Sequence, residues 1–194
     1  MKKIFVALTF MLILTGSHFA ECAEFTREQV AQMISITVNN PAAKNSKFAF
    51  DTETFRKNYN NFIKNFIAAT NAGTDAFMMK KIFMIDELKL HARDEGKIFA
   101  KNFLNKVAIV GLSNDYGKVK VLNIFIAPFE DKNDALFNVL VLQGFVAGIT
   151  PGIDATALFE EIKRSPNETV IHNGVKYSVT TEDNLNVLTA TPAQ

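Results

Sequence analysis

The sequence has few residues that could carry redox or disulfide chemistry. Its 194 residues include one cysteine, Cys22, and no tryptophan. A single cysteine excludes an intramolecular disulfide, and with it a small disulfide-stapled scaffold. With only five prolines and nine glycines, the composition also excludes a collagen-like chain.

The sequence also lacks an excess of charge of either sign. Lysine and arginine number 21 and aspartate and glutamate 20, so the formal net charge is +1. A non-specific nucleic-acid binder needs a basic surface, so we expect no nucleic-acid partner. Hydrophobic residues make up 48% of the chain, which excludes global disorder and allows a sizeable core. The length fits one domain.

Catalytic and cofactor-binding motifs are missing as well. The chain contains no G-x-x-x-x-G-K-[ST] or G-x-G-x-x-G phosphate loop and no G-x-S-x-G nucleophile motif. Its three histidines are His18, His91 and His172. We therefore assign no catalytic, cofactor-binding or metal-ligating residue and expect no cofactor.

The first 23 residues have the layout of a secretory signal peptide. Two lysines precede an apolar run from Ile4 to Leu14, and the small residues Ala20 and Ala23 follow. The run is too short to span a bilayer comfortably, although an uncleaved N-terminal anchor is the alternative. We predict a signal peptide over 1–23 and export to the periplasm or the extracellular medium.

The end of this leader leaves the cleavage site open. Cleavage after residue 20, 22 or 23 is compatible with the sequence, and a cut after Cys22 places the small Ala20 at the −3 position. Lipidation of Cys22 is an alternative, but the charged Glu21 before it departs from a bacterial lipoprotein signal. The remaining residues, 24–194, are predicted to form a single α+β domain.

Hydrophobic periodicity predicts the main helices. Aromatic and aliphatic residues recur at helical spacing over 52–69, with Asp51 as the N-cap. Two more helices are predicted over 134–150 and 154–165. The first of these is very apolar, but its roughly 15 residues fall short of the roughly 20 that a membrane span needs. Its Gly144 and Gly148 lie one turn apart, which favours close packing against another element.

A shorter helix and a loop are predicted before these elements. Thr26 and Gln29 fit a capping box at the start of an N-terminal helix. Asparagine, proline and serine then predict a turn-rich loop over 39–47.

Alternating β-branched residues predict an antiparallel sheet. Two hairpins are expected, over 106–126 and 169–190, and Asn173-Gly174 suits a type I′ turn in the second. Residues 97–104 are a further predicted strand. Residues 82–91 alternate imperfectly and are predicted as a strand, with a helix as the alternative. Helices and antiparallel strands are therefore segregated, which indicates an α+β fold.

Three features together resemble a group of known proteins. They are Gly117-Lys118-Val119-Lys120 at the start of a strand, an apolar helix ending before Pro151, and the closing string 173–179 (NGVKYSV). This layout of the C-terminal half resembles small exported bacterial proteins of unassigned function. The resemblance implies export and carries no activity or functional residue.

Two hypotheses for function follow. The first is an exported, non-catalytic binding or interaction module, because catalytic motifs are missing and a phenylalanine-rich chain can leave an apolar face exposed. The alternative is a small exported hydrolase or metal-assisted enzyme using His91 or His172 with nearby carboxylates. Asp94 and Glu95 adjoin His91, although such clusters are usually solvated turns. The enzyme hypothesis predicts both histidines around one pocket. The sequence leaves the ligand, the partner and the oligomeric state open.

Overall fold

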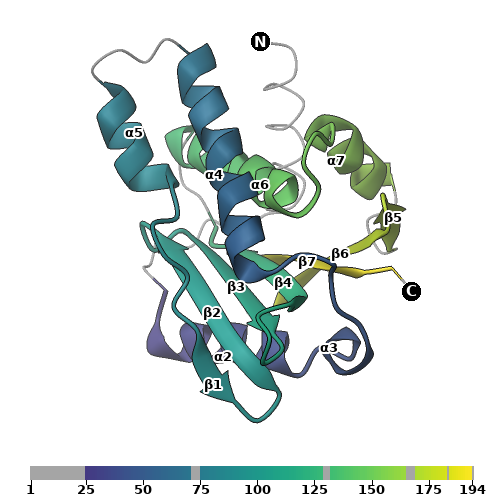
Figure 1. Cartoon of the computed structure of the whole chain (residues 1–194). Coiled ribbons are helices and arrows are strands. Elements are labelled where there is room, and N and C mark those ends of the chain that lie inside the picture. The colour runs from purple at the N-terminus through teal and green to yellow at the C-terminus, as the bar shows by residue number, and fades with distance from the viewer. Residues whose placement is uncertain (1–24, 71–74, 129–131, 165–168, 183, 194) are drawn as a thin grey trace.

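The computed structural model describes residues 25–70, 75–128, 132–164, 169–182 and 184–193 (Figure 1). Its helices are α2 (Arg27–Val38), α3 (Ala42–Asn45), α4 (Thr52–Ala69), α5 (Asp75–Phe83), α6 (Lys132–Ile149) and α7 (Ala155–Arg164). Its strands are β1 (His91–Arg93), β2 (Gly96–Phe103), β3 (Val107–Ser113), β4 (Val119–Ile126), β5 (Val170–His172), β6 (Val175–Glu182) and β7 (Leu185–Pro192). The predicted leader over 1–23 lies outside the described residues.

The strands form one seven-stranded sheet in the order β1-β2-β3-β4-β7-β6-β5, in which every neighbouring pair is antiparallel. Both predicted hairpins are confirmed. In the β5–β6 turn, Asn173 and Gly174 have φ angles of 49° and 74°, the left-handed pair that a type I′ turn requires. The predicted α+β fold is therefore observed.

Helices cover the sheet on both faces (Figure 1). The α4–α7 group packs on one face, and α2 and α3 pack on the other. Alternate residues of β3 show this directly, because Ile109 belongs to the core under α4–α7 and Val110 to the core under α2. Every residue of β3 is buried, as expected for a central strand covered on both sides.

Helix α4 has the predicted bounds and cap. The Asp51 carboxylate accepts a hydrogen bond from the Thr54 backbone N–H at 2.8 Å. Phe55, Tyr59 and Ile63 lie one turn apart and are fully buried, so the predicted apolar face is confirmed as core.

Helix α6 receives the aromatic rings of α4 at its two glycines. A Cβ atom at Gly148 would lie 2.6 Å from Phe55 Cε2, and one at Gly144 would lie 2.7 Å from Tyr59 Cε2. The predicted close packing at these glycines is thus observed, with α4 as the neighbour. Among the described residues, no helix has the length and apolarity to cross a membrane.

Two predictions for local structure are wrong. Residues 82–91 are not a strand: the end of α5 occupies 82–83, residues 84–90 form an irregular linker, and β1 starts only at His91. In this linker, the backbone of Ile85 pairs with the Asn60 side chain of α4 instead of with a strand. The predicted loop over 39–47 contains the one-turn helix α3, which places Ala43 against Leu112 and Val121 of the sheet.

Candidate functional site

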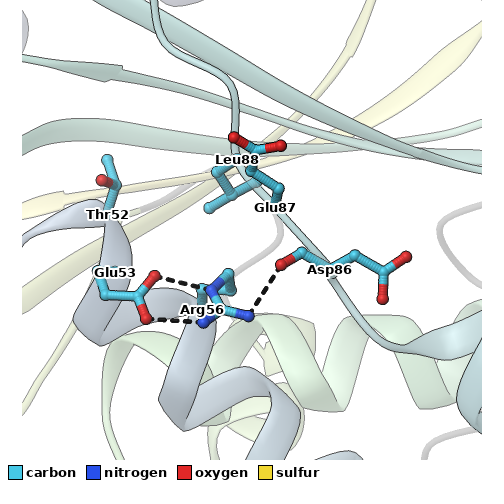
Figure 2. Close-up of a pocket in the computed structure, with 6 residues that line it drawn as sticks. All are labelled: Thr52, Glu53, Arg56, Asp86, Glu87 and Leu88. Atoms are coloured by element: carbon cyan, nitrogen blue, oxygen red, sulfur yellow. Dashed lines mark hydrogen bonds and ion pairs between the residues drawn. The ribbon is translucent and has the colours of Figure 1, made fainter.

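A polar pocket of about 310 Å³ lies between the N-terminal half of α4 and the linker (Figure 2). At its centre, Arg56 donates from Nε and Nη2 to the two carboxylate oxygens of Glu53, both at 2.7 Å. Arg56 Nη1 donates to the backbone carbonyl of Asp86 at 2.9 Å, whereas the Asp86 carboxylate points away from the guanidinium. The hydrogen bonds from Arg56 lower the pKa of the Glu53 carboxyl below its ordinary value.

The same linker is held one helical turn further along α4. The side-chain amide of Asn60 donates to the Ile85 carbonyl at 2.8 Å and accepts from the Ile85 N–H at 2.9 Å. Asn60 and Ile85 are both buried. Arg56 and Asn60 therefore clamp the linker onto α4, and the Glu53–Arg56 pair of the polar pocket positions the chain.

A second concave region, the apolar groove, lies where α4, α5 and α6 meet. Its volume is about 390 Å³, and its lining is entirely apolar. The lining residues are Phe66, Met79, Phe83, Leu136, Phe137, Val139 and Leu140. Ligand pockets are typically concave, apolar and of 300–1,000 Å³. Of the cavities described, this groove fits that description best.

Helix α5 forms the outer wall of the apolar groove. None of its residues is fully buried. Met79 and Phe83 face inward, and the Phe83 ring lies 5.0 Å from that of Phe137 on α6, measured between centroids. The linker clamp at Ile85 follows directly after α5. The hydrogen bonds to Ile85 thus fix the C-terminal end of α5. The helix itself contacts the core only through partly buried side chains.

A third groove, of about 640 Å³, lies beside α3 on the opposite face of the sheet. Its floor carries Thr189 and Thr191 of β7, Ser178 and Lys176 of β6, and Ile171 of β5. Three of these five residues carry a hydroxyl group. It has the volume of a ligand site, but its lining combines scattered polar and apolar groups and does not define one chemistry.

The residues of the enzyme hypothesis are not brought together. His91 lies on β1 and His172 on β5, the strands at the two opposite edges of the sheet. Asp94 and Glu95 form the exposed turn between β1 and β2, as predicted. Across the β5–β6 hairpin, His172 pairs with Val175, and Tyr177 pairs with Val170. The Nδ1 atom of His172 lies 3.9 Å from a carboxylate oxygen of Glu161 instead.

The described residues contain no cluster of three or more His, Cys, Asp or Glu side chains placed to hold a metal ion. Cys22 and His18 lie outside them. Within the part of the chain that the structure describes, we assign no metal or cofactor to any set of residues.

The apolar groove is the feature that sequence reasoning missed. Phe66 belongs to the apolar repeat of α4, yet it is only partly buried and lines the groove. A usable signal was present in Phe77-Met78-Met79, an apolar triplet that cannot face one side of a helix. It indicates a helix that is apolar on more than one face.

No protein-family model, curated protein or solved structure matches this chain.

Proposed function

We propose that the protein is an exported, non-catalytic binding module whose ligand is an apolar chain held in the apolar groove. The observation that carries the proposal is a groove of ligand size lined only by apolar side chains, with its mouth open at Leu136. Leu136 is 46% exposed, so the groove is open to solvent at this side chain.

The lining favours a flexible alkyl chain over a rigid polar ligand. Met79 is unbranched and adapts its shape, and Phe66 and Phe83 supply flat apolar surface. No charged or hydrogen-bonding side chain lines the groove. The affinity of a ligand there must therefore come from removal of its apolar surface from water. Any polar head group would remain at the mouth, in solvent.

We expect alkyl ligands to bind with an affinity that rises with chain length. Each buried methylene contributes about 0.8 kcal/mol, which corresponds to about fourfold in Kd, until the groove is full. The measurement is displacement of the uncharged fluorescent probe N-phenyl-1-naphthylamine by a series of alkanols. An affinity independent of chain length would contradict binding in this groove.

The matched variants are Leu136→Trp and Ile171→Trp. Leu136 lines the mouth of the groove, whereas Ile171, which is 62% exposed, lies on β5 away from it. The indole introduced at Leu136 should fill the groove and weaken alkanol binding at least tenfold. The same ring introduced at Ile171 should leave the binding unchanged. Equal binding by the two variants would overturn the proposal.

Export is the second part of the proposal, and the layout of residues 1–23 supports it. We expect the intact mass of the protein purified from its source to match a chain beginning after residue 20, 22 or 23. A diacylglycerol adduct on Cys22 would instead indicate a membrane-tethered lipoprotein. A mass that includes the leader would contradict processing.

A further inference from the structure

The outward face of α5 exposes two large apolar side chains to solvent. Phe77 is 73% exposed and Met78 is 53% exposed, and neither lines the apolar groove. Lys81 follows them by four and three residues, which places it on the same helix face. We call Phe77, Met78, Lys80 and Lys81 the α5 patch.

Positive charge gathers around the α5 patch. Residues 57–89 contain five lysines and three acidic residues, Asp75, Asp86 and Glu87, a net charge of +2 in a chain whose total is +1. Lys57 lies 3.7 Å from Glu53 at the start of α4. The other lysines, Lys64, Lys80, Lys81 and Lys89, are exposed. This segment is therefore cationic, and the rest of the chain has a net charge of −1.

We propose that the α5 patch docks the protein on an anionic lipid surface. Apolar side chains beside lysines on a surface helix are typical of interfacial binding, in which the apolar groups enter the boundary of the acyl chains and the lysines meet anionic head groups. Phe77 and Met78 would enter the acyl-chain boundary, and Lys80 and Lys81 would meet the anionic head groups. The inference does not depend on the function proposed above, because no residue of the patch lines the groove.

The patch fits a lipid surface better than a second copy of the chain. A stable protein interface buries about 800 Å² on each partner, which is more than two side chains of a nine-residue helix can supply. Lysine is also depleted from the cores of such interfaces. Pairing two patches would also place four lysines in one interface, where their like charges would repel.

Vesicle flotation of the processed protein tests the inference. We expect binding to phosphatidylglycerol vesicles that weakens as salt is added, and much weaker binding to phosphatidylcholine vesicles. The Lys80→Gln/Lys81→Gln variant should bind the anionic vesicles about tenfold or more weakly. The Phe77→Ser/Met78→Ser variant should show a loss of at least tenfold.

Tyr116→Ser is the matched control. Tyr116 is 90% exposed in the β3–β4 turn, where Gly117 accepts a hydrogen bond from the first residue of α4. The α5 patch lies on a separate helix that follows the other end of α4 in the chain. Tyr116→Ser should bind anionic vesicles as the unmodified protein does.

Three results would overturn the inference. The first is absence of binding to anionic vesicles by the folded, processed protein. The second is a loss in Tyr116→Ser as large as that in Phe77→Ser/Met78→Ser. The third is a dimer in light scattering that Phe77→Ser/Met78→Ser converts to monomer, because the patch would then be an interface between copies. Leu136→Trp should retain vesicle binding, so failure of the groove proposal is distinguishable.

Discussion

Replacing Asn60 with alanine is expected to lower the free energy of unfolding by about 3 kcal/mol. The amide of Asn60 occupies both backbone groups of Ile85, at 2.8 and 2.9 Å, and Ile85 is fully buried. Alanine would leave the Ile85 N–H without a partner. The Ile85 carbonyl would retain only Arg56 Nη1, at 3.3 Å. Urea denaturation followed by circular dichroism measures the change.

Asn138→Leu is the control for this substitution. Asn138 is also a buried asparagine, but neither of its side-chain polar atoms has a hydrogen-bond partner among the described residues. Leucine, of similar size, should therefore raise the free energy of unfolding by about 1 kcal/mol. Changes of opposite sign in the free energy of unfolding at the two positions would show that the hydrogen bonds from Asn60 to Ile85 stabilise the fold. A cost below about 1 kcal/mol for Asn60→Ala would contradict the clamp.

Local patterns were sufficient to predict most of the elements. Helix α4 was predicted with its observed bounds because its cap and its repeat of buried residues both lie within 51–69. The β5–β6 turn was predictable because asparagine and glycine tolerate positive φ wherever they occur. Such features depend on residues that are neighbours in the sequence, so they can be predicted without the tertiary fold.

The failures concern partners that are distant in the sequence. Alternation in 82–91 favoured a strand, but the partner of Ile85 is a side chain 25 residues earlier. Similarly, the separation of His91 from His172 follows from the order of strands in the sheet, which no local pattern specifies. The apolar groove is lined by residues of three helices, so it forms only when those helices pack together.

Gly111→Ala is expected to lower the free energy of unfolding by about 2 to 3 kcal/mol. Gly111 on β3 lies directly opposite Phe99 on β2, and the phenylalanine ring covers the glycine. A Cβ atom at Gly111 would lie 2.2 Å from Phe99 Cζ and within 2.8 Å of two further ring atoms. The ring would have to move, yet it is fully buried in the core under α4–α7. Thermal and urea unfolding measure the loss.

The cost should depend on the ring and not on the backbone of Gly111. In a Phe99→Leu background the smaller side chain leaves space, so adding Gly111→Ala should cost less than about 1 kcal/mol, and the double-mutant cycle reports the difference. Gly117→Ala is the complementary control, because nothing lies within 4 Å of its added Cβ but its φ is +78°. It should cost about 1 kcal/mol through backbone strain alone. An equal cost of Gly111→Ala with and without the Phe99 ring would contradict the prediction, because the cost would then not arise from contact with the ring.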